Sequence, residues 1–475
     1  MYAGDMSIYT LMELLESVVS DPRAHAAPLW DLEVHNGYVQ SIRPATNSDA
    51  PPQLLLPPLC HPHIHLDKAY ILTCNHRRSP ALPDYSDLCP DTGSFEEALS
   101  HTARAKERYT PEDLYLRGSQ LLATSYSQGV TSMRAFVELD HVTGTLPLTT
   151  AIRLKEDFSH LVQVQICAFA QDPIFSTTHG EGNRVVVERA IVEFPHAIDA
   201  LGTTPYVEAS REASLANIHW AVETALKHNL HLDFHLDYNL NPPSTIPSHR
   251  PLTHSVLESL HQYKWAEIAD KSKTIVLGHC TQLSMMSEAE RKSLADAVIA
   301  SNLPIHFVGL PTSDLFMMGR PSADDSDDSI SSQNRPRGTI HVPSMVKGLG
   351  LSVCLGVNNV GNAFTPFGTA DPLQLASWAV GIYQAGTVGD AELLYACVSS
   401  RARQAIGLDQ DSKGGHFPIY RGQKLRGMLM LKNRYFITLP GPVGHPSIDV
   451  ASRFRLSLKD VVWDPPQSDL RCIVA

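Results

Sequence analysis

Histidines end three separate apolar segments of the chain, and each segment has the composition of a buried strand: His63 with His65, His235, and His279. Residues two apart in a strand face the same side, so the first two imidazoles can point in one direction. Imidazole nitrogens bind zinc, iron and related divalent ions. A packed core histidine explains any one of these residues, but three such strand ends together predict a metal site.

A metal site of this kind needs a fold that brings the strand ends together. Eight short apolar runs alternate with longer amphipathic stretches, and they lie at 54–66, 130–138, 161–169, 203–209, 231–237, 274–280, 303–310 and 351–359. Near-continuous apolar runs are typical of parallel strands that are covered on both faces. The alternation predicts a (β/α)8 barrel, in which active sites lie at the C-terminal ends of the strands. A doubly wound open sheet is the structural alternative.

The intervening patterns predict helices at 112–127, 183–200, 214–228, 254–270, 287–301 and 372–387. We expect the barrel to span residues 54–408. Residues 1–53 should form an N-terminal amphipathic helix and part of a small β-sandwich, with Asn36-Gly37 as a hairpin turn. Residues 409–475 should supply the remainder of this sandwich and a C-terminal tail. The Ser/Asp/Pro-rich segment 321–337 is expected to be a solvated loop or a lid on the active-site side.

Composition narrows the class of partner. The chain has 475 residues and a formal net charge of −12, which argues against a nucleic-acid partner. It contains no apolar run of about 18 residues, so we expect no membrane span. The N-terminus lacks the basic region of a signal peptide, and the eight cysteines form no Cys-x-x-Cys pair. A cytoplasmic enzyme with a small-molecule substrate is therefore expected, and a homo-oligomer is compatible with these features.

Six segments in chain order carry a family resemblance: PHIHLDKA (62–69), QICAFAQDPI (165–174), PYVEASREAS (205–214), GHCTQLSMM (278–286), LPTSDLFMMGR (310–320) and VCLGVNNVGNAFTPFGTADPLQLA (353–376). Over about residues 50–408 the sequence resembles the cytosine-deaminase branch of the amidohydrolase superfamily. The resemblance implies one divalent ion, zinc or iron, with these ligands: His63, His65, His235 and Asn358. It also implies that His279 stands near the attacking water and that Gln171 contacts the substrate.

Two positions depart from the family pattern. Tyr238 stands where the family has a glutamate that shuttles protons, and Asn358 stands where it has an aspartate ligand. A neutral ligand set lowers the pKa of metal-bound water, to about 7 at a comparable three-histidine zinc site. Tyrosine has an ordinary pKa of about 10, so Tyr238 would donate a proton and seldom accept one. Loss of general acid–base help costs a factor of roughly 10²–10⁴ in rate.

Other polar residues are candidates for the missing roles. His279, Asp237 and Asp314 could take part in proton transfer, and Lys68 and Arg320 could anchor a substrate. A solvated charge is the alternative for Lys68, and a surface ion pair is the alternative for Arg320.

The sequence thus predicts a metal-dependent enzyme that hydrolyses a C–N bond of a small cyclic compound, by deamination or by opening a cyclic amide. One alternative is a non-hydrolytic, metal-assisted reaction in the same pocket, such as elimination, decarboxylation or cyclisation. The other is an inactive barrel that binds a small molecule.

Overall fold

A computed structural model describes most of the chain. The described residues are 6–12, 29–45, 50–74, 82–243, 250–320, 336–408, 419–425 and 427–474. Most of the predicted loop or lid, residues 321–335, lies outside them. None of the described helices is both long and apolar enough to cross a membrane.

Eight parallel strands form one sheet in the order β12-β11-β10-β9-β8-β7-β6-β5. Their bounds are β5 Leu59–His65, β6 Val130–Glu138, β7 Gln163–Ala170, β8 Ile198–Thr203, β9 His231–Leu236, β10 Ile275–His279, β11 Ile305–Gly309 and β12 Val353–Leu355. Backbone hydrogen bonds join Asn358, just after β12, to His63 and His65 of β5 and so connect the two edges of the sheet. The predicted (β/α)8 barrel is confirmed.

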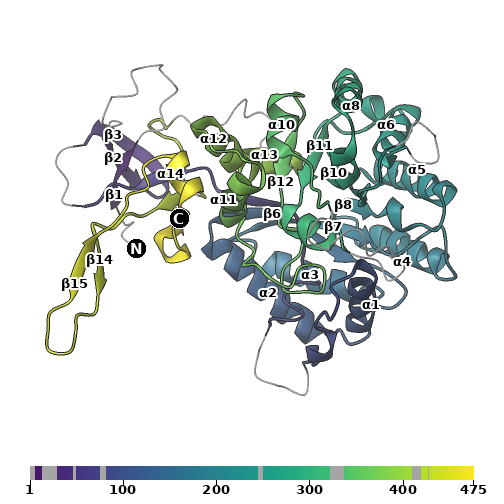
Figure 1. The fold of residues 1–475 in the computed structure, drawn as a ribbon, viewed down its shortest axis with the longest axis horizontal. Helices are drawn as coiled ribbons and strands as arrows, with labels where there is room; N and C mark the ends of the chain where they lie inside the picture. The colour runs from purple at the N-terminus through teal and green to yellow at the C-terminus, as the bar shows by residue number, and fades with distance from the viewer. Residues whose placement is uncertain are drawn as a thin grey trace.

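Helices surround the barrel and connect each of its strands to the next (Figure 1). Their bounds are α1 Phe95–Lys106, α2 Pro111–Ser127, α3 Leu146–Asp157, α4 Gly180–Glu193, α5 Arg211–His228, α6 Leu252–Gln262, α7 Trp265–Ile268, α8 Glu288–Ala300, α9 Pro311–Met317, α10 Val342–Lys347, α11 Pro372–Ile382, α12 Val388–Cys397, α13 Ser400–Ala405 and α14 Leu458–Trp463. Short 3-10 helices lie at η1 Ser86–Leu88, η2 Pro205–Val207, η4 Thr281–Met285 and η6 Ser468–Leu470.

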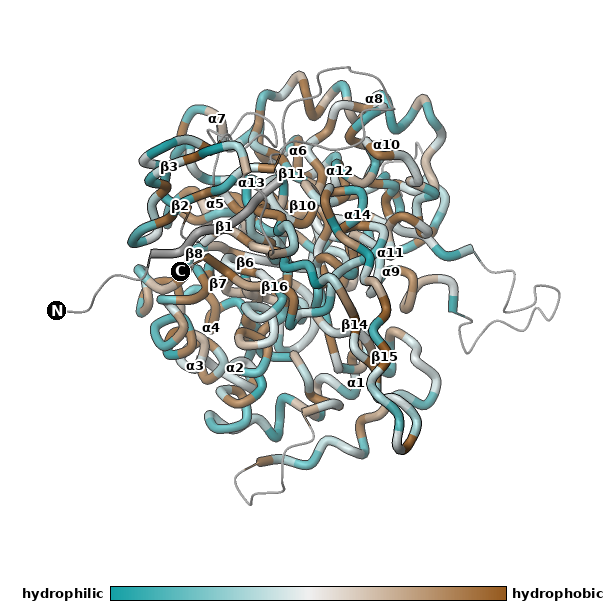
Figure 2. The backbone as a smooth tube through the Cα atoms, turned by 90° about the vertical axis from the view of Figure 1, so that its left-hand side faces the viewer, coloured by the Kyte–Doolittle hydropathy of each residue, from teal (hydrophilic) through white to brown (hydrophobic). Residues whose placement is uncertain are grey.

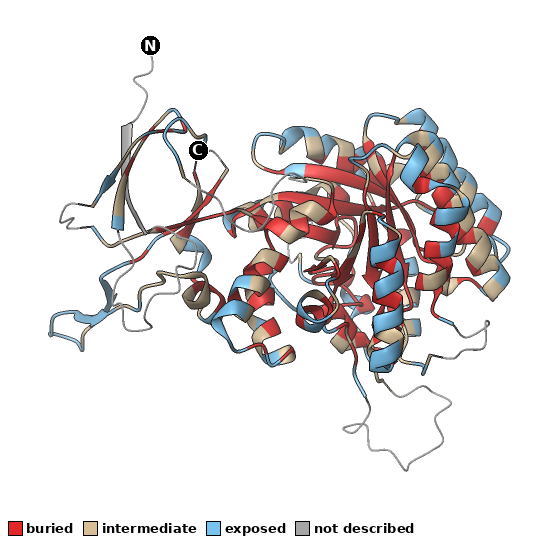
Figure 3. Cartoon of the chain, turned by 90° about the horizontal axis from the view of Figure 1, so that it is seen from above, coloured by how far each residue is buried: buried red, intermediate tan, exposed pale blue. Residues whose placement is uncertain are grey.

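Burial follows this layering. The barrel strands are buried almost throughout, and the surrounding helices carry exposed residues on their outward faces (Figure 3). In Figure 2 the strands near labels β6 and β7 are largely hydrophobic, whereas the outer helices mix hydrophobic and hydrophilic residues. This is the pattern expected of a parallel sheet that is covered on its outer face by helices.

One predicted strand was wrong. The fourth barrel strand is Ile198–Thr203 and does not lie at 203–209, where the chain turns into η2. Pro205 begins η2, and proline has no backbone N–H to donate to a strand ladder. The helix predicted over 183–200 accordingly ends at Glu193.

Both chain ends contribute to a small β-sandwich beside the barrel, as predicted (Figure 1). One sheet contains β1 Met6–Met12, β2 Leu29–His35 and β3 Tyr38–Pro44, and the other contains β4 Leu54–Leu56, β13 Leu429–Leu431 and β16 Arg471–Ile473. The sheets share a buried core of Leu32, Val34, Val39, Leu55, Leu425, Met428, Met430 and Val474. An antiparallel ribbon, β14 Phe436–Leu439 with β15 Ile448–Ala451, projects from this region.

The predicted N-terminal helix is wrong for residues Met6–Met12. This segment pairs antiparallel with β2 over its whole length and so extends the β2–β3 hairpin by a third strand. The predicted hairpin turn is confirmed: Asn36 and Gly37 have φ values of 51° and 77°, which suit the tight turns of two-residue hairpins.

Candidate metal centre

The three histidines predicted to bind metal meet inside the C-terminal mouth of the barrel. His63 and His65 lie at the end of β5, and His235 lies on β9. The Nε2 atom of His235 is 3.0 Å from Nε2 of His63 and 3.2 Å from Nε2 of His65. All three side chains are buried. Strand ends that are far apart in the sequence therefore place three imidazole nitrogens around one point.

The spacing of these nitrogens fits a shared divalent ion. Two nitrogens that each lie about 2.0–2.1 Å from one ion, at an angle of about 90–110°, are about 2.9–3.4 Å apart. Burial lowers the pKa of each imidazole well below its usual value. The rings are therefore neutral, which is the form that binds a metal.

Asn358 offers a fourth ligand at the same point. Its side chain lies beside His63 and His65, and its Oδ1 atom is buried without a hydrogen-bond partner among the described residues. The backbone has a φ of 68°, a left-handed conformation that asparagine adopts more readily than most residues. A buried carbonyl oxygen without a partner is suited to a cation. Together these residues fit a site of three imidazoles and one amide oxygen.

A buried ion pair lies beneath the histidines. The Asp233 carboxylate is 3.7 Å from Nδ1 of His63 and 3.0 Å from Nη1 of Arg134. Burial raises the pKa of Asp233 to about 7, although the nearby guanidinium favours the ionised form. Sequence reasoning missed Asp233, although it shares a strand face with His235 two residues later. At 3.7 Å the contact with His63 is too long for a hydrogen bond, so Asp233 acts on that ring through its charge.

His279 is fixed by a second carboxylate. Its Nδ1 atom is 2.7 Å from Oδ1 of Asp314, and the Thr339 hydroxyl donates to the other Asp314 oxygen at 2.7 Å. The His279 ring lies 5.2 Å from the ring of His235, measured between centroids. Because Nδ1 is engaged, Nε2 is the ring nitrogen left for water or substrate. The structure thus brings two predicted catalytic residues together in one hydrogen-bonded pair.

Tyr238 packs directly against His279. The ring centroids are 4.0 Å apart, and the Tyr238 hydroxyl lies 3.4 Å from the carbonyl oxygen of Ser313. Burial raises the pKa of Tyr238 well above its usual value. The phenol therefore stays protonated and can act as a hydrogen-bond donor beside the histidines.

Gln171 and Lys68 lie together at the edge of the site. Gln171 lines the same cavity as His65, His235 and His279, and its Oε1 atom accepts a hydrogen bond from Lys68 at 3.2 Å. The buried Lys68 ammonium also pairs with Glu138 at 2.7 Å. Lys68 therefore holds Gln171 in place, whereas the Gln171 amide borders the cavity.

Two predicted site residues lie elsewhere. The Asp237 carboxylate accepts hydrogen bonds from the backbone amides of Leu252 and Thr253, at the start of α6, and is committed to that helix end. Arg320 donates to the backbone carbonyls of Phe316 and Thr92. Neither residue lines the cavity that contains His235 and His279.

Several solved structures share the fold of this chain. No protein-family model matches the chain, and no curated protein matches it. Among solved structures, a 5-methylcytosine deaminase from Klebsiella pneumoniae liganded with phosphonocytosine matches with a TM-score of 0.70 and 18% identity, over 96% of this chain and 92% of that chain. The chain has the fold of this deaminase.

Two further structures share the fold. N-isopropylammelide isopropylaminohydrolase from Burkholderia multivorans matches with a TM-score of 0.61 and 17% identity, over 99% of this chain and all of that chain. An adenosine deaminase from Xanthomonas campestris with bound zinc matches with a TM-score of 0.51 and 14% identity, over 90% of this chain and 84% of that chain. The predicted resemblance to cytosine deaminases is thus confirmed at the level of the fold.

Aromatic side chains close the site in this deaminase-like barrel. Phe95, Tyr206, Tyr238 and Phe364 line the cavity, and the Phe95 ring lies within 6.3 Å of each of the other three rings. The free volume is about 20 Å³, which is room for about one water molecule. A substrate must therefore displace side chains to enter. Sequence reasoning did not single out Phe95, which begins α1 far from any strand end, or Tyr206, which follows β8 in η2 and lay inside the segment predicted to be a strand.

A cluster of three carboxylates beside the site surrounds the side chain of a buried lysine. Lys106 lies 2.6 Å from Glu138, 2.7 Å from Asp140 and 2.8 Å from Asp172. Its ammonium group occupies the point between the three carboxylates and pairs with each of them, which is where a metal ion would otherwise bind. Because Glu138 also pairs with Lys68, the network supports the residue that holds Gln171.

Proposed function

We propose that the chain is a metal-dependent enzyme of the amidohydrolase superfamily that hydrolyses a C–N bond in a small cyclic compound. The observation that carries this proposal is the convergence of His63, His65 and His235, whose Nε2 atoms lie 3.0 Å and 3.2 Å apart in two pairs. The proposed ion is zinc or iron, with the Asn358 amide oxygen as the fourth ligand.

The bound ion would activate water and polarise the electrophilic carbon. The Nε2 atom of His279 would hold the attacking water and accept one of its protons, since Asp314 fixes the ring through Nδ1. The Tyr238 hydroxyl would donate a hydrogen bond to the departing nitrogen. Gln171 would hold an edge of the substrate ring, because its side chain borders the cavity and is anchored by Lys68.

The bond changes are those of hydrolysis. The water oxygen bonds to the ring carbon, and the C–N bond breaks with its electron pair moving to nitrogen. One water proton goes to that nitrogen, and the other stays on the new C–O group or moves to a ring nitrogen. His279 can carry the first proton from water to the leaving nitrogen. The proposal of a C–N bond is supported by the fold shared with a 5-methylcytosine deaminase and an N-isopropylammelide isopropylaminohydrolase.

A non-hydrolytic reaction is the second candidate, and one observation favours it. None of the described residues that line the cavity is an aspartate or a glutamate, and Asp314 reaches the site only through His279. Elimination, decarboxylation or cyclisation needs a Lewis acid and a proton donor, and Tyr238 could supply the proton.

Two measurements test the proposal. Elemental analysis of the purified full-length protein should find about one zinc or iron ion per chain, and turnover should be found on a panel of aminopyrimidines, aminotriazines and cyclic amides. In ¹⁸O-labelled water, hydrolysis places solvent oxygen in the product, whereas the non-hydrolytic reactions do not. A protein that holds and takes up no transition ion would refute the proposal, and metal binding without turnover would identify an inactive barrel.

A further inference from the structure

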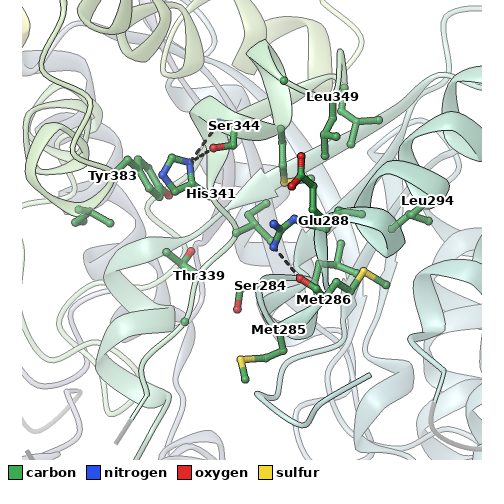
Figure 4. A pocket seen from close by; sticks show the side chains of 18 of the residues that line it. Ser284, Met285, Met286, Glu288, Leu294, Thr339, His341, Ser344, Leu349 and Tyr383 are labelled. Atoms are coloured by element: carbon green, nitrogen blue, oxygen red, sulfur yellow. Dashed lines mark hydrogen bonds between the residues drawn. The ribbon is translucent and has the colours of Figure 1, made fainter. Parts of the chain in front are cut away.

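A second, larger cavity lies between η4, α8 and α10 (Figure 4). Its volume is about 710 Å³, within the range of about 300–1,000 Å³ that small-molecule sites occupy. Among the described residues it shares no lining residue with the cavity of the metal centre. Residues 337–341, which follow the segment outside the described part of the chain, form one of its walls.

The walls of this cavity are mainly apolar. Buried side chains of Leu283, Leu294, Ile340 and Met345 contribute to them. In Figure 4, Leu294 and Met286 lie on one side, and Tyr383, His341 and Thr339 lie on the other. A ligand that fills this space needs an apolar body, because most of the surface it would meet cannot hydrogen-bond.

Tyr383 lines the cavity and carries a buried hydroxyl that lacks a hydrogen-bond partner. The residue is 5% exposed, and its hydroxyl lies near Thr339 but makes no hydrogen bond of good geometry with any described residue. Burial raises the pKa of this phenol, so it remains a donor. A buried donor without an acceptor is costly, and a bound acceptor would relieve that cost.

The charges around the cavity are predominantly positive. Two arginines line it, Arg291 and Arg337, whereas Glu288 is the one acidic residue among its described lining residues. One guanidinium nitrogen of Arg291 donates a hydrogen bond to the Met286 carbonyl oxygen. Arg337 forms no hydrogen bond or ion pair with a described residue.

We propose that this cavity is a second binding site, which takes a small apolar carboxylic acid. The hydrocarbon part would pack on the leucine and methionine walls. The carboxylate would be attracted by the arginines and would supply the acceptor that the Tyr383 hydroxyl lacks. A chain of hydrogen bonds connects this cavity to the metal centre. Thr339 lines the cavity and donates to Asp314, which accepts a hydrogen bond from His279.

The test is calorimetric titration of the full-length protein with octanoate, with 1-octanol as the uncharged counterpart. We expect one saturable octanoate site per chain and weaker binding of 1-octanol. Tyr383→Phe should weaken octanoate binding by about 3- to 10-fold, the effect of one hydrogen bond. Arg337→Glu should weaken it by about 10-fold or more, since it replaces attraction by repulsion.

Two controls locate the site. Lys292→Glu makes the same charge change on an exposed residue of α8 that does not line the cavity, and it should leave octanoate binding unchanged. His235→Ala alters the metal centre and should also leave it unchanged, which separates this site from coordination of octanoate by a metal. Absence of saturable binding, equal affinity for 1-octanol, or unaltered binding in correctly folded Tyr383→Phe and Arg337→Glu proteins would overturn the proposal.

Discussion

The backbone N–H of Asn358 donates to the carbonyl oxygen of His63 at 3.1 Å, and the carbonyl oxygen of Asn358 accepts from the N–H of His65 at 2.9 Å. These bonds connect the first and last strands of the barrel. The pairing that closes the sheet thus also fixes the distance of Asn358 from His63 and His65, all three of which are predicted metal ligands. The hydrogen bonds that close the barrel therefore also position Asn358 relative to His63 and His65.

Replacing His235 by alanine should abolish stoichiometric metal binding. Its Nε2 atom is the one within 3.2 Å of both other imidazoles, so its loss removes the centre of the ligand set. Loss of residues that merely support ligands costs about 10–100-fold in affinity, and loss of a ligand should cost more. Elemental analysis and competition with a chelator measure this. His228→Ala, at the end of α5, is the matched control and should retain the metal.

Asn358→Asp should tighten metal binding by about an order of magnitude, because ligand charge increases the affinity for a divalent ion. The same change should raise the pKa of metal-bound water, because it reduces the net positive charge. Chelator competition and the pH profile of kcat measure the two effects. Asn359→Asp adds the same charge at a residue whose Oδ1 already accepts from Asn362, and it should shift the affinity much less. Equal effects of both variants would contradict a ligand role for Asn358.

Asp314→Asn should lower kcat by about 10²–10⁴-fold, the range for loss of general acid–base help, while the metal content stays unchanged. The carboxylate accepts from Nδ1 of His279 at 2.7 Å and so fixes which ring nitrogen carries the proton. An asparagine cannot enforce that tautomer. Thr339→Val removes only the outer hydrogen bond and should cause a smaller decrease in kcat. Steady-state kinetics with elemental analysis of each variant provides the measurement, and a full-rate Asp314→Asn protein would exclude this role.

Tyr238→Phe should reduce kcat by about 10²-fold, because it removes the hydrogen bond that the phenol would donate to the departing nitrogen in the transition state. The aromatic ring is kept, so packing against His279 and the midpoint of thermal unfolding should change little. Tyr206→Phe is the control, since Tyr206 lines the same cavity and its ring lies 5.8 Å from that of Tyr238. An equal loss in both variants would mean that the effect comes from general changes in the cavity.

Lys106→Met should lower the free energy of unfolding by about 3–5 kcal/mol, the cost of leaving buried charges without their partner. Urea unfolding measures it, with Lys227→Met on the exposed surface of α5 as the control. Burial alone would raise the pKa of Asp140, but Lys106 lowers it. The stabilisation that the Lys106–Asp140 ion pair gives to the folded state is therefore complete above the usual aspartate pKa of about 3.9. It is lost as the pH falls from there through the lower pKa of Asp140 in the folded protein. The difference in stability between wild type and variant should accordingly narrow in acid.

The strand-end histidines illustrate what a sequence can reveal. His63 and His65 share a strand face by their spacing alone, and the alternation of apolar runs with helical patterns indicates parallel strands whose ends meet. Errors arose where local pattern and backbone chemistry disagree. An apolar run at 203–209 suggested a strand, but Pro205 cannot donate to a ladder, and the neighbouring segment Ile198–Thr203 forms the strand.

The chain by itself determined the barrel, the histidines that meet at its mouth and the hairpin at Asn36-Gly37, because these depend on periodicity, spacing and turn chemistry within short segments. The tertiary structure alone decided that Asp237 caps α6 and that Asp314 holds His279, although both are aspartates near strand ends. Side-chain direction at a strand end is set by one or two backbone angles and by the neighbours that packing supplies. Those neighbours come from distant parts of the chain, and local sequence does not encode them.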